Sequence, residues 1–241
     1  MKKILLLLSV AFISIQSISA QTIKGLFDKV TKIAPASSDN LSDDDIISGL
    51  KDALRVGTDS SAKRLSKLNG FFGDAAIKIL MPEEAKKMER TLRNFGMGSL
   101  VDKAILSMNR AAEDAASGVG NIFGDAIKQM SIKDGLQILR GGDFAATDYL
   151  KSITTKELTE KFRPVIEASL IKVDATKYWK DVFTAYNRFS NAPVNTDLTA
   201  FVTERALSGL FYNISLEEQK IRKNPAAQVT DILKKVFGTK I

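Results

Sequence analysis

The sequence predicts an all-α protein: a single compact multi-helix domain of about eleven helices with almost no strand. Proline is rare, with 5 residues among 241, while alanine, leucine, lysine and isoleucine are plentiful, which favours helix. Apolar residues recur at helical spacing in most segments. The connections between these segments are short, so nothing after residue 41 divides the chain into further domains.

The first 41 residues are predicted to lie outside this domain. Residues 1–20 have the layout of a cleavable signal peptide: two lysines, an apolar stretch and small residues at Ser19 and Ala20. The stretch is short for a spanning helix, so cleavage is favoured over an uncleaved anchor. Residues 21–41 are predicted to form a short amphipathic helix and a linker before the domain of residues 42–241. We therefore expect a periplasmic protein with no transmembrane segment after cleavage and no lipid anchor, since no cysteine stands at the cleavage site.

The chain contains neither cysteine nor histidine. Nucleophile systems that need histidine are therefore excluded, as are the usual zinc sites, and we expect no metal and no cofactor. The net charge is +7, but the basic residues alternate with acidic ones along the predicted helices. This pattern favours a solvated surface over attraction to anionic lipid, polysaccharide or nucleic acid. No nucleic-acid motif is present.

The first half of the domain is predicted to hold five helices. Ser42 is an N-cap followed by three aspartates, which suit the positive end of a helix. Residues 76–81 alternate apolar and other residues before Pro82, which predicts an extended segment packed across helices. Ser131 starts a capping box. The five helices are expected over residues 42–68, 82–95, 99–116, 119–130 and 131–140.

The second half is predicted to hold six further helices. Asp143 and Asp197 are expected to cap two of them, and Thr154 and Ser215 open sequences typical of capping boxes. The aromatic face of residues 178–189 fits either the wall of an apolar ligand cavity or ordinary core, and core is favoured. These helices are expected over residues 143–152, 154–173, 174–189, 197–214, 215–224 and 226–237.

Several long blocks resemble the bacterial exported family known as DUF4197. The blocks are SMNRAAEDA, DAIKQMSIKD, LRGGDFAATDYL, TKELTEKFRPVI, AFVTERALSGLFY and EEQKIRKNPAAQVTDILKKVFG, and the resemblance covers about residues 40 to 238. It implies a helical exported protein, often with a signal peptide or lipoprotein leader. It implies no known activity, cofactor or catalytic residue. This chain lacks the leader cysteine of the lipoprotein members.

One candidate site joins polar residues of the 99–116 helix to a double glycine. In the functional interpretation, Arg110 binds an anion beside backbone N–H groups that follow the glycines. The alternative, which we favour, is a buried structural network that satisfies helix ends. The residues are Asn109, Arg110, Glu113, Gly141, Gly142 and Asp143.

A second candidate site is formed by Glu217, Glu218 and Arg222. Paired carboxylates suit acid–base chemistry or a metal. A capping box ending at Glu218 and an ordinary i,i+4 pair with Arg222 explain the same residues without a site, and this interpretation is favoured. Arg163 is a further candidate because the proline after it leaves a helix carbonyl without its usual partner.

The residues thus predict a non-enzymatic exported protein that binds an envelope partner or a small apolar or anionic ligand. The alternative is a periplasmic hydrolase or lyase that uses carboxylates and Arg110. A third possibility is a purely structural protein whose polar groups pair with one another inside. An enzyme of this kind needs an open cleft in which Asn109, Arg110, Glu113 and a second acid converge.

Overall fold

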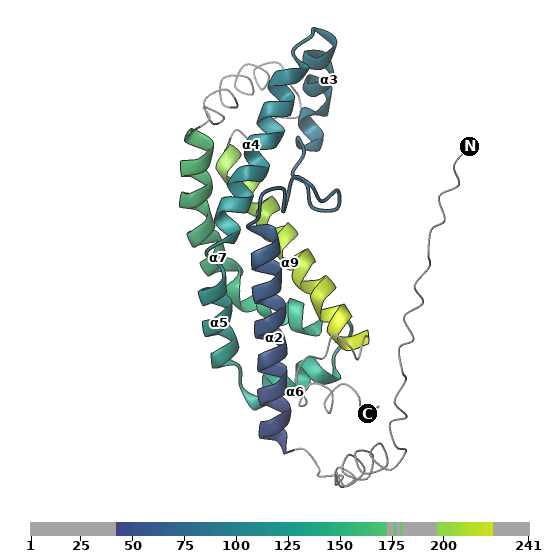
Figure 1. The fold of residues 1–241 in the computed structure, drawn as a ribbon, viewed down its shortest axis with the longest axis vertical. Coiled ribbons are helices and arrows are strands. Elements are labelled where there is room, and N and C mark those ends of the chain that lie inside the picture. Colours follow the sequence, from purple (N-terminus) through teal and green to yellow (C-terminus); the bar gives the residue numbers. More distant parts are fainter. Residues whose placement is uncertain (1–41, 173–175, 177–178, 180–196, 224–241) are drawn as a thin grey trace, which may run out of the picture. The chain divides into compact units, whose positions relative to one another are not determined.

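The structure is a computed structural model that describes residues 42–172, Thr176, Trp179 and 197–223. The chain divides into two units, residues 1–41 and 42–241, and every described residue lies in the second. These residues form seven α-helices and one short 3-10 helix, with no strand among them, which confirms the all-α prediction for this part of the chain (Figure 1). The elements are α2 (Asp43–Leu65), η1 (Glu83–Ala85), α3 (Lys86–Asn94), α4 (Gly98–Ala116), α5 (Gly120–Gln129), α6 (Ile132–Arg140), α7 (Ala145–Ile171) and α9 (Leu198–Lys223).

Two predicted helix breaks are wrong, because α7 and α9 run through them. The hydroxyl of Thr154 donates to the Leu150 carbonyl at 2.6 Å, and that of Ser215 donates to the Tyr212 carbonyl at 2.7 Å. Both side chains therefore bond back to the preceding turn instead of accepting the N–H three residues ahead. The helices predicted over 143–152 and 154–173 are therefore one helix, α7, and those predicted over 197–214 and 215–224 are one helix, α9. Three predicted helices lie outside the described residues: the short one within residues 21–41, most of the one over 174–189, and the one over 226–237.

The predicted N-caps of α2, α6 and α9 are confirmed. Ser42 and Ser131 each accept the N–H of an aspartate three residues ahead at 3.2 Å. Asp197 accepts the Ala200 N–H at 2.9 Å. The cap predicted for Asp143 is wrong: α7 starts after Phe144, which makes no side-chain cap bond.

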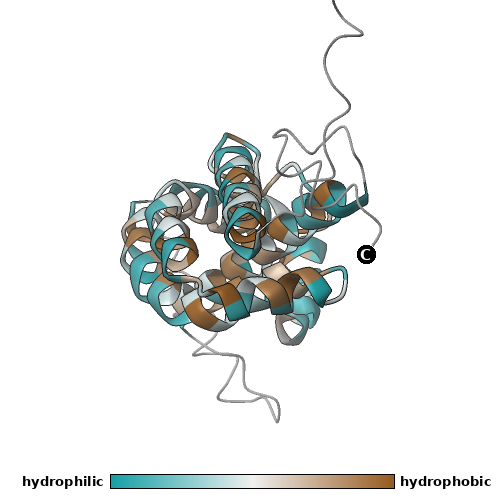
Figure 2. Cartoon of the chain, turned by 90° about the horizontal axis from the view of Figure 1, so that it is seen from below, coloured by the Kyte–Doolittle hydropathy of each residue, from teal (hydrophilic) through white to brown (hydrophobic). Residues whose placement is uncertain are grey.

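Helix α7 contacts α4, α5, α6 and α9, and α2 packs against the same four helices (Figure 1). Viewed from below, the apolar faces of the helices turn toward one another (Figure 2). In α4 four alanines are buried, and their small side chains allow close approach of α7 and α9. Trp179 is buried and stacks on Phe201, as a core position requires.

The segment between α2 and η1 crosses the helices without forming one of its own. It begins with a turn at Asn69, whose φ of 66° lies in the left-handed region that asparagine tolerates. From there it runs between α4 and α9. Ile77, Ile79 and Met81 are buried while Ala76 and Leu80 are exposed, so the predicted alternation over 76–81 is confirmed. The extended conformation begins only after residues 75–77, which form a turn closed by hydrogen bonds to the Asp74 carbonyl.

Candidate functional site

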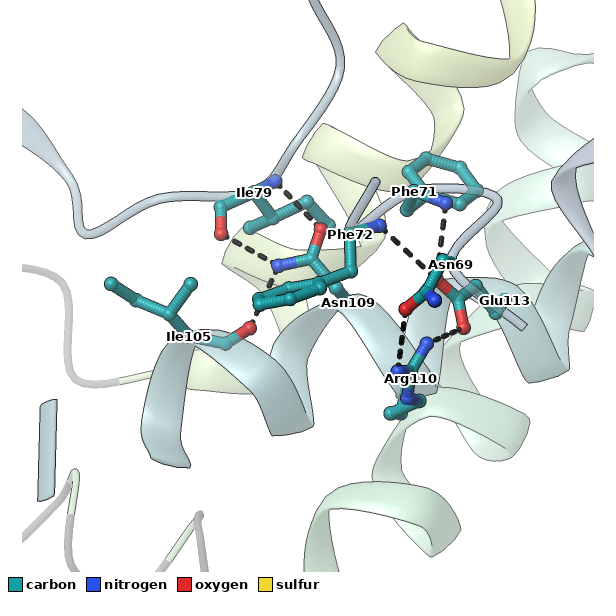
Figure 3. A network of polar contacts seen from close by, with 8 residues as sticks. All are labelled: Asn69, Phe71, Phe72, Ile79, Ile105, Asn109, Arg110 and Glu113. Carbon is teal, nitrogen blue, oxygen red and sulfur yellow. Dashed lines mark hydrogen bonds and ion pairs between the residues drawn. The ribbon is translucent and has the colours of Figure 1, made fainter. Parts of the chain in front are cut away.

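Asn109 holds the extended segment onto α4. Its side chain is fully buried, accepts the Ile79 N–H at 2.9 Å and donates to the Ile79 carbonyl at 2.8 Å (Figure 3). It also donates to the Ile105 carbonyl, one turn back in α4, at 2.7 Å. The amide thus takes the place of one residue of a neighbouring strand. The backbone of Ile79 is satisfied although no strand is present beside it in the described part of the chain.

Glu113 performs a related task one turn further along α4. It is buried, and its Oε1 accepts the N–H groups of Phe71 and Phe72, each at 3.1 Å. Its other oxygen is paired with Arg110, which also donates to the Asn69 side chain at 2.8 Å (Figure 3). Both carboxylate oxygens are therefore occupied. The structural interpretation of Asn109, Arg110 and Glu113 explains every contact that these side chains make here.

The double glycine and Asp143 have other neighbours than the residues predicted to join them. Gly141 ends α6, and a Cβ on it would lie 2.4 Å from the Cβ of Ala145, so only glycine fits. Asp143 pairs with Lys223 at 2.7 Å, and this hydrogen bond lowers its pKa. Arg110 is engaged by Glu113 on α4, whereas the two glycines lie at the α6–α7 corner. None of the described contacts joins the two halves of this candidate site.

That corner is organised by Glu218 and Arg222 of α9. Glu218 accepts the N–H groups of Ala146 and Thr147, at 3.0 and 2.8 Å, and the Thr147 hydroxyl at 2.7 Å. It therefore caps the start of α7 from another helix, which explains why Asp143 does not. Arg222 donates to Glu218 at 2.9 Å and to the Ile138 carbonyl near the end of α6 at 3.0 Å. The capping box predicted for Glu218 is wrong, but its structural role is supported.

The remaining candidates form partly exposed ion pairs. Glu217 lies 4.0 Å from Arg64 and 3.6 Å from Lys220. Arg163 reaches Asp197 at 2.7 Å instead of a carbonyl freed by Pro164. Burial raises the pKa of Asp197, but hydrogen bonds from Arg163 and the Ala200 N–H outweigh it and leave the pKa below its usual value. These residues link helices and do not converge on one cleft.

The structure contains a groove that none of the predicted site residues lines. It has a volume of about 390 Å³, within the range of small-molecule sites, and lies between the extended segment and α9. One wall is residues 76–83. The other is a face of α9 on which Arg205, Ser208 and Tyr212 are exposed, with the partly buried Phe201 and the buried Gly209. Gly209 lies under this groove, where a Cβ would come within 2.7 Å of the Phe71 ring.

The groove carries positive charge. The Arg205 guanidinium lies over the Phe201 ring at 5.5 Å, and the Lys78 ammonium lies over the Phe72 ring at 3.8 Å. Among the described residues no carboxylate pairs with either cation. Glu83 also lines the groove, but it is paired with Lys86 at 2.6 Å. Phe201 and Phe72 therefore position the cations Arg205 and Lys78 at the groove. Glu83 is the one acid among the described residues that line it, and it already forms an ion pair.

The groove also borders an unused backbone edge. In an extended segment, alternate residues direct their N–H and C=O groups to opposite sides. Asn109 occupies the side of Ile79, so the groups of Leu80 face the other side. No described residue hydrogen-bonds the N–H or the carbonyl of Leu80. An edge of this kind can accept an additional extended chain.

Two other hollows are less suited to a ligand. An open hollow of about 610 Å³ between α4 and α7 includes Glu113 and Asp114, but Glu113 is occupied and Asp114 accepts a hydrogen bond from Ser169 at 2.7 Å. Asn109 and Arg110 do not line it. A small apolar cavity beside Glu218 has a volume of about 30 Å³, enough for a water molecule. No cluster of three potential metal ligands occurs among the described residues.

Comparison with known proteins identifies the family. A model described as "Protein of unknown function (DUF4197)" matches residues 40–238. The chain belongs to DUF4197. No curated protein and no solved structure matches it. The family therefore fixes the extent of the domain, and the chemistry of this DUF4197 protein has to be argued from its own side chains.

Sequence reasoning missed the groove residues Lys78, Leu80, Arg205 and Tyr212. Arg205 and Tyr212 lie seven residues apart, hence on one face of a helix, and this was the signal available. The opposite wall comes from a segment more than a hundred residues earlier. Nothing local indicates that the two meet.

Proposed function

We propose that this DUF4197 protein is an exported binding protein that holds an acidic, extended peptide segment of an envelope partner in the groove between residues 76–83 and α9. Export is proposed on the signal-like pattern of residues 1–20. The observation that carries the binding proposal is the unoccupied edge of Leu80 beside two cations without a described carboxylate partner.

Each part of the groove has a role in this proposal. The backbone of Leu80 pairs with the peptide backbone, as in strand addition, and this supplies affinity independent of sequence. Arg205 and Lys78 select acidic side chains or a terminal carboxylate. The exposed ring of Tyr212 offers apolar surface with a hydroxyl at its tip. Asn109 keeps the segment extended from the opposite side, so the edge is formed before the peptide arrives.

Binding is better supported than hydrolysis or elimination. A carboxylate that acts as a general base must have a free oxygen within reach of a substrate proton. Glu113 and Glu218 each accept two backbone N–H groups and contact an arginine, so both oxygens of each carboxylate are already engaged. The groove itself contains one acid, Glu83, and it forms an ion pair.

The proposal is tested by calorimetric titration with a capped peptide of alternating valine and aspartate. A peptide of alternating valine and lysine is the charge control. We expect the acidic peptide to bind and the basic one not to. Arg205→Ala should weaken binding about five- to tenfold, the loss of one charge-assisted contact. Arg55→Ala, which removes an exposed arginine of α2, should leave it unchanged.

The backbone contribution is tested separately at Leu80. Leu80→Pro removes the N–H that strand addition needs and keeps an extended conformation, while Leu80→Ala shortens the side chain and keeps the N–H. We expect binding to be lost in the first variant and retained in the second. Equal binding by both, or equal binding of the acidic and basic peptides, would overturn the proposal.

A further inference from the structure

The turn between α3 and α4 exposes large apolar side chains at a place where nothing described covers them. Phe95 is 76% exposed, Leu100 57% and Met97 39%. We call residues 90–103, which contain them, the hairpin tip. Isolated exposed apolar residues are common on proteins, but three within six positions at one turn form a patch.

The backbone of the tip projects these side chains. Gly96 adopts φ 76°, in the left-handed region, and ends α3, and Gly98 begins α4. Phe95 and Met97 therefore lie in the connection itself. Of the helices, α3 packs chiefly against α4, and none of its nine residues is buried. In Figure 1 the hairpin occupies the opposite end of the described helices from α6.

Cationic residues flank the apolar ones in the sequence of the tip. Between residues 90 and 103 the chain has three cations and one carboxylate: Arg90, Arg93, Lys103 and Asp102. Arg93 bridges Glu89 and Asp102, at 2.9 and 2.8 Å, and thereby ties α3 to α4. Arg90 and Lys103 are exposed, and no ion pair of theirs occurs among the described residues. The tip is thus apolar at its end and positive at its base.

We propose that the hairpin tip is a membrane-docking wedge that inserts Phe95, Met97 and Leu100 into the surface of an anionic phospholipid bilayer. No described helix is both long and apolar enough to span a bilayer. Apolar side chains enter the boundary between head groups and acyl chains, while Arg90 and Lys103 contact lipid phosphates. The positive base favours anionic lipid over a second copy of the same positively charged tip, which like charges would repel.

The absence of cysteine from the chain allows a test at single positions. We would label Met97→Cys with an environment-sensitive fluorophore in the full chain and add vesicles of phosphatidylglycerol or of phosphatidylcholine alone. The matched control is Lys133→Cys, an exposed position on α6. Because the readout is local, attachment through any other segment does not imitate it. The groove between residues 76–83 and α9 takes no part, so the outcome is independent of the peptide proposal.

We expect a blue shift and protection from aqueous quenchers at position 97 with phosphatidylglycerol, and no change at position 133. Apparent affinity should be at least about tenfold lower for phosphatidylcholine and should fall as salt rises. Adding Phe95→Ser to the labelled protein should lower its apparent affinity for phosphatidylglycerol vesicles about tenfold. Arg90→Gln combined with Lys103→Gln should remove the preference for phosphatidylglycerol over phosphatidylcholine. No shift at 97, an equal shift at 133, or a shift that depends on protein concentration without vesicles, which indicates a second copy, would overturn the proposal.

Discussion

Replacing Asn109 with alanine tests whether the extended segment is held by one side chain. The substitution removes both partners of Ile79, whose N–H and carbonyl are bonded at 2.9 and 2.8 Å in a site with no solvent access to the asparagine. The Ile105 carbonyl also loses a bond, at 2.7 Å, but as a helical carbonyl it keeps its backbone partner.

The magnitude follows from two orphaned backbone groups. Each costs about 1–3 kcal/mol when it remains buried, and a water molecule entering the space left by the amide recovers part of this. We expect the free energy of unfolding to fall by about 3 kcal/mol, and the melting temperature by about 6–12 °C for a domain of this size. Exchange of the Ile79 amide hydrogen should accelerate by a larger factor than that of the α4 amides.

The assay is urea unfolding followed by circular dichroism, with Thr154→Val as the matched control. Thr154 is as buried as Asn109, but its hydroxyl bonds only to the Leu150 carbonyl, which α7 already satisfies. That control should stay within about 1 kcal/mol of the wild type. If Asn109→Ala costs no more than the control, the segment is held by its apolar contacts and the reasoning about Asn109 is refuted.

Three further predictions concern the buried acids and the ion pairs. Arg110→Ala should lower the melting temperature by about 4–8 °C, because Glu113 loses its counter-charge while remaining buried; an unchanged value in differential scanning calorimetry would contradict a structural role. Glu218→Ala should cost about 3–5 kcal/mol in urea unfolding, since it frees two helix N–H groups and an arginine. Asp197→Asn should reduce the loss of unfolding free energy that the wild type shows as pH falls into the acid range. The pKa of Asp197 is lowered, so its contribution is full above the unfolded value of 3.8 and is lost as pH falls through the folded value.

The sequence predicts the helices best where capping and apolar spacing agree. The box from Ser131 to Asp134 and the alternation of Ile77, Ile79 and Met81 are local patterns, and both are confirmed. Thr154 and Ser215 have the same local pattern as a cap. Their hydroxyls bond to carbonyls of the preceding turn inside continuous helices. Burial of the apolar face therefore determines where these helices begin and end, and the local capping pattern does not.

The candidate site could be predicted less well because its partners are distant in sequence. Asn109, Arg110 and Glu113 stand out as polar residues on an apolar helix, and that much is visible in the chain. Their partners lie 30 to 42 residues earlier, in a segment without regular structure. The sequence predicts a structural role for Glu218 but assigns it to a local capping box, because the partners that it contacts in the fold lie 71 and 72 residues earlier.

The remote cap at Glu218 has a consequence for how the chain folds. Isolated helices frequently fray at the first turn, and a local cap limits this without help from elsewhere. In α7 the N–H groups of the first turn gain their acceptor, Glu218, only when α9 has packed. Arg222, which pairs with Glu218, also donates to a carbonyl near the end of α6. A nascent chain that stops before α9 therefore cannot form the contacts that join the end of α6 to the start of α7. The three helices are expected to lose their amide protection together, so that even the first turn of α7 exchanges with solvent by a cooperative opening and not by fraying.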